Sequence, residues 1–154
     1  MESKIKILTK LNKVQEEIKV LKDKNAMGRY NYRSAEDILT EVKPLLKKYK
    51  LVLVVDDEII HFQDEGVSIY QGLDRKGEKE TKKESLSRYY IKATATLYDI
   101  ESGEFIFSSA NAREVHEKLG MDGAQLTGSS SSYARKYALS GLLCLDDNRD
   151  IDEK

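Results

Sequence analysis

The sequence has few of the residue types that support metal, disulfide or histidine chemistry. Its 154 residues include one cysteine, Cys144, and two histidines, His61 and His116. A single cysteine cannot close a disulfide within the chain or build a cysteine-based zinc site, and the two histidines lie far apart in sequence. The composition therefore indicates a cytoplasmic protein that needs no metal and no other cofactor.

Long apolar runs and a strong net charge are also missing. No apolar run approaches the roughly 20 residues that cross a bilayer, and a lysine-rich segment, not the apolar core of a signal peptide, follows Met1. The net charge is −1, yet residues 1–50 hold 13 Lys and Arg against 7 Asp and Glu. The mean charge argues against nucleic-acid binding, whereas the local charge leaves it open, with a solvated lysine-rich helix as the alternative.

Apolar spacing predicts two helices near the N-terminus. A row with spacings of 4, 3, 4 and 3 predicts a helix within residues 1–24, which either packs on the domain or forms a subunit contact: Ile7, Leu11, Val14, Ile18 and Leu21. Ser34 and Asp37 then have capping-box spacing and predict a helix over 34–49. Pro44 lies inside this second helix and predicts a bend.

The middle of the chain changes to a period of two. Short strands are expected at 51–55, 58–62 and 67–70, and the charge-rich stretch 73–87 is expected to be a mobile loop. Alternation from Tyr90 to Tyr98, a turn ending at Gly103 and a partner strand at 105–110 predict a β-hairpin. The acid-rich stretch 146–154 is expected to form a tail.

A final helix over 124–144 completes a single α+β domain spanning residues 1–154. We predict an antiparallel sheet with a β-hairpin, packed against this long C-terminal helix and accompanied by N-terminal helices. The helix is rich in glycine and serine, which are poor helix formers, so we expect something to approach it closely. Nucleotide hydrolysis is excluded, because Ser129 stands where a P-loop after Gly123 and Gly128 requires lysine.

Two segments have the composition of a nucleic-acid surface. At 100° per residue, small and basic residues share one side of the last helix: Gly128, Ser129, Ser132, Arg135 and Lys136. The other side is apolar and includes Tyr133 and Tyr137, although Leu139 and Leu143 fall on the basic side, so that part of it must be buried. The stretch 29–33 interleaves two arginines with two tyrosines, as in sequence-tolerant single-strand binding, and Arg113 is a further cation. Packing of small residues and a loop fixed by its tyrosines are the structural alternatives.

Two acidic clusters suggest a different function. Asp56, Asp57 and Glu58 follow a strand, as magnesium ligands of nucleases often do. The second cluster lies near the end of the sequence and consists of Asp146, Asp147, Asp150 and Asp152. The terminal acids do not complete a calcium loop, because Ile151 replaces the required glycine. Solvated turn and tail acids are the simpler explanation of both clusters.

Three stretches together resemble the essential recombination function (ERF) family of bacteriophage single-strand annealing recombinases. They are GRYNYRSAEDI at 28–38, ATATL at 93–97 and GMDGAQLTGSSSSYARKYAL at 120–139. The resemblance implies an ATP-independent protein, not an enzyme, that coats single-stranded DNA as a homo-oligomeric ring or filament and anneals complementary strands. It also implies the core fold of strand-annealing proteins and a place in the bacterial host cytoplasm, with a single-strand binding protein or an exonuclease of host or phage as a further partner.

The resemblance also implies DNA-binding residues. In the last helix they are Gln125, Thr127, Tyr133, Arg135 and Lys136, and in the earlier segment Arg29, Tyr30, Tyr32 and Arg33. Two other functions stay open on residues alone. One is a metal-dependent nuclease that uses Asp56, Asp57 or the terminal acids, and the other is a non-catalytic adaptor whose tyrosines and serines contact another protein.

Overall fold

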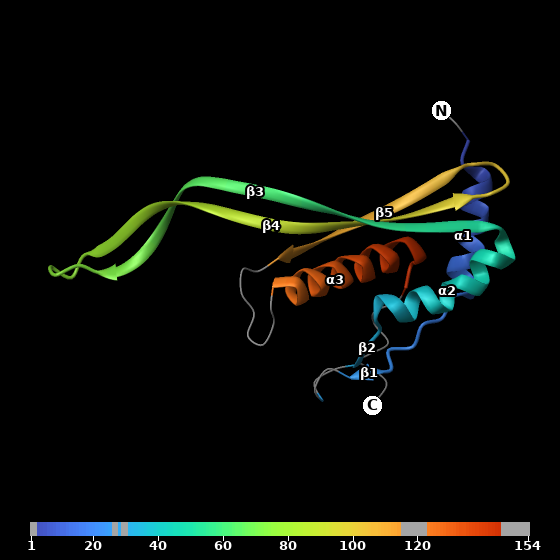
Figure 1. The fold of residues 1–154 in the computed structure, drawn as a ribbon, viewed down its shortest axis with the longest axis horizontal. Helices are drawn as coiled ribbons and strands as arrows, with labels where there is room; N and C mark the ends of the chain where they lie inside the picture. The colour runs from blue at the N-terminus through green and yellow to red at the C-terminus, as the bar shows by residue number, and fades with distance from the viewer. Residues whose placement is uncertain (1–2, 26–27, 29–30, 115–122, 146–154) are drawn as a thin grey trace.

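The computed structural model describes residues 3–25, 28, 31–114 and 123–145, without the side chains of 64–71, 81–87, 114 and 123–127. Over these residues the chain forms three helices and five strands, with helices gathered on one side of an antiparallel sheet (Figure 1). The predicted α+β class, with its hairpin and long C-terminal helix, is confirmed.

The main sheet has the order β3–β4–β5, formed by Leu51–Leu73, Lys79–Asp99 and Phe105–Glu114. Pairing of β4 with β5 ends at Tyr89 and Glu114, and beyond this point β3 and β4 continue as a two-stranded ribbon away from the helices (Figure 1). A smaller antiparallel pair joins β1 (Lys24–Asn25) to β2 (Asn31–Tyr32).

The ribbon corrects the expected loop over 73–87. Strand β3 runs to Leu73 in place of three short strands, β4 begins at Lys79, and only the turn 74–78 separates them. The Asp74 carboxylate accepts hydrogen bonds from the backbone N–H groups of Lys76 (2.8 Å) and Glu78 (2.9 Å), while Gly77 has φ +77°. Pairing between the strands satisfies the backbone groups that face the partner strand, and the ribbon forms although its sequence lacks the apolar pattern by which strands are recognised.

The core lies between the sheet and α3 (Gly123–Leu143). The predicted hairpin is confirmed, and its inward-facing residues on β4 are almost completely buried: Ile91, Ala93, Ala95 and Leu97. Two of these are alanines, which lets α3 approach the sheet closely. At Gly141 an added Cβ would lie 2.9 Å from Ser108 Oγ of β5. The close approach expected from the small residues of this helix therefore exists at Gly141.

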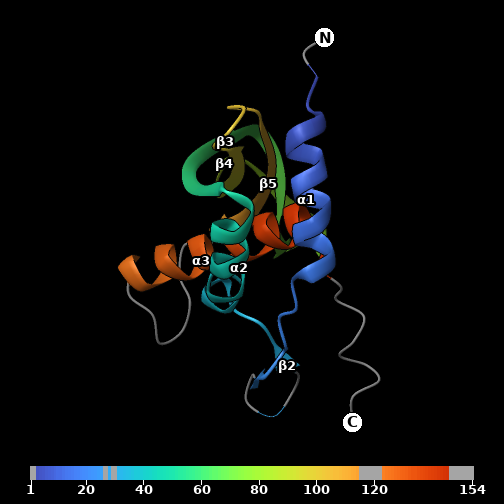
Figure 2. The same cartoon turned by 90° about the vertical axis from the view of Figure 1, so that its right-hand side faces the viewer.

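Helix α1 (Ile5–Glu17) is shorter than the predicted 1–24. Ile18 adopts an extended conformation and ends the helix, and Leu21 is 69% exposed. The rest of the predicted apolar row is buried in the domain's own core and is therefore not available as a subunit contact: Ile7, Leu11, Val14 and Ile18. The end of α3 meets α1 (Figure 2), where Gln15 Nε2 donates a hydrogen bond to the Leu142 carbonyl (2.8 Å).

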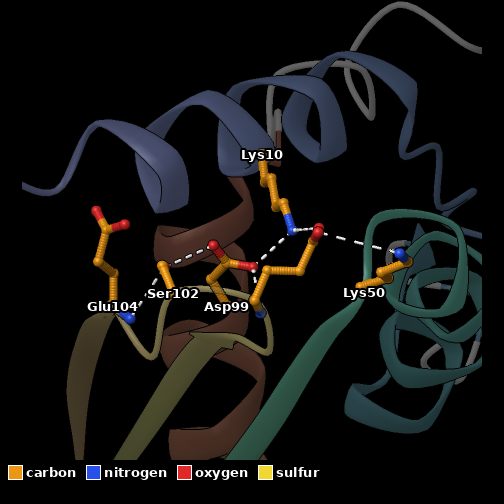
Figure 3. Close-up of polar contacts among 6 residues, drawn as sticks. Lys10, Lys50, Asp99, Ser102 and Glu104 are labelled. Atoms are coloured by element: carbon orange, nitrogen blue, oxygen red, sulfur yellow. Dashed lines mark hydrogen bonds and ion pairs between the residues drawn. The ribbon is translucent and has the colours of Figure 1, made fainter.

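A buried carboxylate fastens α1 to the β4–β5 turn (Figure 3). Asp99 is 1% exposed and accepts from Lys10 Nζ at 2.5 Å, from Ser102 Oγ at 2.6 Å and from the Glu101 N–H at 3.2 Å. The hydrogen bond from Lys10, followed by that from Ser102, lowers the pKa of Asp99 to about 2. The turn is thus anchored to the first helix as well as to its own strands.

Helix α2 (Ala35–Tyr49) begins with the predicted capping box. Ser34 Oγ accepts from the Asp37 N–H (3.1 Å), and the Asp37 carboxylate accepts from the Ser34 N–H (2.9 Å). The backbone bond from Ser34 leads the interactions that lower the pKa of Asp37. The helix runs through Pro44 to Tyr49, with Ile38 and Val42 buried. This cap fixes the direction in which the chain enters α2, beside α3.

Candidate nucleic-acid interface

A surface pocket joins the two segments that sequence composition singled out. Its volume is about 350 Å³, and it lies between the entry to α2 and the outer side of α3. The first segment contributes Tyr32, Arg33, Ser34, Ala35 and Glu36, and α3 contributes Ser129, Ser132, Tyr133 and Lys136. Side chains about 100 residues apart in sequence therefore line one pocket.

Lys136 stands among three tyrosine rings. Its ammonium lies 4.8 Å from the ring centroid of Tyr133, 5.1 Å from that of Tyr137 and 6.0 Å from that of Tyr32. These distances are within the range of cation–π attraction. Among the described residues Lys136 forms no ion pair with a carboxylate, so the ammonium is available to a phosphate.

Arg33 supplies a second positive charge to the pocket. It is only 5% exposed and lies directly before the Ser34 cap. Arg33 and Lys136 are the basic residues of the pocket lining, and Glu36 is its acidic residue.

Arg135 points to a different place from Lys136, which corrects the prediction that they share one side. Arg135 Nε lies 3.0 and 3.3 Å from the two carboxylate oxygens of Asp57 on β3, and Ser131 Oγ donates to the same carboxylate. Partial burial raises the pKa of Asp57, but the hydrogen bonds from Arg135 and Ser131 outweigh it and lower the pKa overall. Because adjacent helix positions differ by 100°, Arg135 faces the sheet and Lys136 faces the pocket.

The tyrosines of α3 also differ from the prediction. Tyr133 and Tyr137 were placed on the apolar side, yet they are 50% and 43% exposed and pack against each other with ring centroids 5.2 Å apart. The buried side is formed by Ser130, Ala134, Ala138, Leu139, Leu142 and Leu143. The burial predicted for Leu139 and Leu143 is thus confirmed, and it occurs within the chain.

Of the remaining predicted residues, the structure describes the side chain of Arg113 alone, and it does not reach the pocket. Arg113 is exposed and pairs in register with Tyr90, on the sheet face opposite the buried Ile91 and its partner Ala112 and hence away from α3. Arg29 and Tyr30 lie outside the described residues, as do the side chains of Gln125 and Thr127. Their DNA-binding roles stay predictions.

Sequence reasoning missed two residues of this surface. Helix periodicity puts Tyr137 on the apolar side of the last helix, although its spacing of four from Tyr133 and one from Lys136 is compatible with a shared cluster. Glu36 was noted only as part of a motif, and no local pattern marks it, because its position depends on how α2 meets α3.

Of the two acidic clusters that suggest a nuclease, the structure describes the first, at Asp56, Asp57 and Glu58. Both carboxylate oxygens of Asp57 are engaged by Arg135. Within the described ranges no three histidine, cysteine, aspartate or glutamate side chains gather as metal ligands. The terminal acids of 146–154 lie outside these ranges.

The fold and the pocket together define an α+β domain with a cationic, tyrosine-lined surface, which suits a ligand that carries both phosphates and aromatic rings. Comparison with known proteins identifies the family. The ERF superfamily matches residues 7–154, and the chain belongs to this family. It is 44% identical over 144 residues to the essential recombination function protein of Salmonella phage P22. The matched residues make up 93% of this chain and 57% of the relative.

The chain thus spans a little over half the length of that relative. No solved structure gives a significant match. In the part of the chain that is described, none of the helices has the length and apolar character of a membrane span.

Proposed function

We propose that the chain binds single-stranded DNA across the α2–α3 pocket and anneals complementary strands without ATP in bacteriophage recombination. The observation that carries this proposal is the convergence of Tyr32, Tyr133 and Lys136 in one pocket from segments far apart in sequence. Membership of the ERF superfamily and the name of the phage P22 relative support it.

The lining of the pocket matches the two repeating chemical parts of a single strand. Tyrosine rings stack on bases of any identity, and the ammonium of Lys136 attracts the phosphates. Annealing forms and breaks no covalent bond, so the protein needs no nucleophile, general base or metal. We therefore propose that it is not an enzyme.

Function through a homo-oligomer is the second part of the proposal. A pocket with so few cations binds a strand weakly, so the pocket must be repeated along the strand to hold it. The sheet face opposite α3 offers one surface for self-association, since it exposes apolar side chains of β3 and β5: Val52, Val54, Phe105 and Phe107. The outer strands β3 and β5 offer sheet edges as well.

The test is annealing of two complementary labelled oligonucleotides without nucleotide, over a salt series, with mass photometry of the same samples. We expect a large oligomer that accelerates annealing and loses this effect as salt rises. A monomer that leaves the annealing rate unchanged would refute the proposal and favour the adaptor. Magnesium-dependent loss of labelled DNA would instead identify a nuclease.

A further inference from the structure

Glu36 is an unexpected residue in a pocket for a polyanion. It lies in the first turn of α2, lines the pocket with Lys136 and Arg33, and is exposed. A carboxylate at this place repels phosphate and lowers the affinity for any nucleic acid. The carboxylate therefore contributes to ligand binding only if it contacts a hydrogen-bond donor of the ligand.

Within the described structure, the carboxylate of Glu36 has no hydrogen bond or ion pair. The neighbouring acid, Asp37, is fully used, since it closes the capping box and pairs with Lys24 at 3.1 Å. Ser129 and Ser132, which line the same pocket, likewise form no side-chain hydrogen bond to a described residue. The pocket thus presents an acceptor carboxylate and hydroxyls beside stacking rings.

We propose that Glu36 accepts a hydrogen bond from the exocyclic amino group of one nucleobase per subunit, while the base stacks on a pocket tyrosine. A carboxylate is the natural acceptor for cytosine N4, whereas uracil and thymine present a carbonyl oxygen that it repels. The pocket then favours cytosine over uracil. This inference rests on the proposed binding of single-stranded DNA and adds a base preference to it.

The contact is compatible with annealing. An exocyclic amino group has two hydrogens, and only one of them is used in Watson–Crick pairing. In cytosine, as in adenine, the other points to the edge that faces the major groove in a duplex, where the amino group of a paired base remains readable. Glu36 can therefore hold the base while its pairing edge stays open.

The experiment compares oligo(dC) with oligo(dU) of equal length, whose bases differ at position 4 (amino against carbonyl) and, as a consequence, at N3 of the pairing edge (acceptor against N–H donor). Binding is measured by fluorescence anisotropy at slightly alkaline pH and fixed salt, for the wild type, Glu36→Ala, Glu36→Gln and Glu41→Ala. Glu41 is an exposed acid of the same helix outside the pocket lining, so its variant matches the charge change.

We expect the wild type and Glu41→Ala to bind oligo(dC) roughly three- to tenfold more tightly than oligo(dU). Both Glu36 variants should bring this ratio close to one, and Glu36→Gln keeps the side-chain size should Glu36→Ala destabilise the helix. A wild-type ratio near one, or an unchanged ratio in folded Glu36 variants, would overturn the inference and leave Glu36 a charge that serves the helix terminus. Failure of the wild type to bind either oligonucleotide would instead overturn the proposed function.

Discussion

Lys136 and Arg135 carry the same charge at adjacent positions, yet the structure gives them different roles. Lys136 lies among pocket tyrosines, whereas Arg135 is paired with Asp57 on β3. We predict that Lys136→Ala weakens binding of single-stranded DNA and leaves the fold intact. Arg135→Ala should leave most of the binding and lower the stability.

The magnitudes follow from the contacts. For a single strand, each phosphate contact contributes about 0.7 to the steepness with which log K falls against log salt concentration. When salt rises from 50 to 200 mM, the affinity of the Lys136→Ala variant should therefore fall by roughly 2.6-fold less per site than that of the wild type. The Arg135–Asp57 pair is 39% and 25% exposed at its two side chains. Solvent screening limits such a pair to about 0.5–1 kcal/mol, or roughly 1–4 °C in Tm for a chain of this size.

The assay is anisotropy with a labelled oligonucleotide at several salt concentrations, together with thermal unfolding and mass photometry of both variants. Lys136→Ala should give a flatter salt dependence at unchanged Tm and oligomer size. Equal losses of binding in the two variants, or a flatter salt dependence for Arg135→Ala alone, would refute the separation of the two cations.

Three further predictions concern the scaffold. Asp99→Asn, which removes the ion pair with Lys10, should cost about 2 kcal/mol and lower the Tm by several degrees, measured by calorimetry. Because the folded pKa of Asp99 is about 2, below its ordinary 3.8, its contribution is complete above pH 4 and is lost as the pH falls towards 2. The Tm difference between wild type and Asp99→Asn should therefore shrink in that window, and a constant difference would contradict the assignment. Gly141→Ala should lower the Tm despite alanine's helix propensity, because its Cβ meets Ser108 Oγ at 2.9 Å, and adding Ser108→Ala should restore stability.

Local sequence signals predicted the elements that local interactions determine. The alternation from Tyr90 to Tyr98 and the pair Ser34–Asp37 encode a hairpin and a helix cap over a few residues, and both are confirmed. The end of α1 at Glu17 was missed because Leu21 continues the apolar spacing in sequence while remaining exposed. The ribbon was missed because the charge-rich sequence of 73–87 lacks the apolar alternation by which strands are recognised.

The residue types of the candidate site could be predicted from the sequence, but which of these residues line the pocket and which pair elsewhere could not. Tyrosines, serines and cations of 29–33 and 128–136 were recognised, and Tyr32, Arg33, Tyr133 and Lys136 do line one pocket. The assignment of Arg135 depends on Asp57, which lies 78 residues away, and helix periodicity contains no information about that partner. The position of Glu36 in the pocket likewise depends on tertiary packing, because it results from the contact of α2 with α3.

The most direct test of the central claim is photo-crosslinking of the protein to single-stranded DNA that contains 5-iododeoxyuridine, with residue-level mass spectrometry. This probe reacts with aromatic side chains that stack on the base. If the pocket between α2 and α3 holds the strand, the crosslinks will map to Tyr32, Tyr133 or Tyr137. Crosslinks confined to Tyr98, Phe105 and Phe107, on the sheet face opposite α3, would contradict the account and move the DNA to the other side of the molecule.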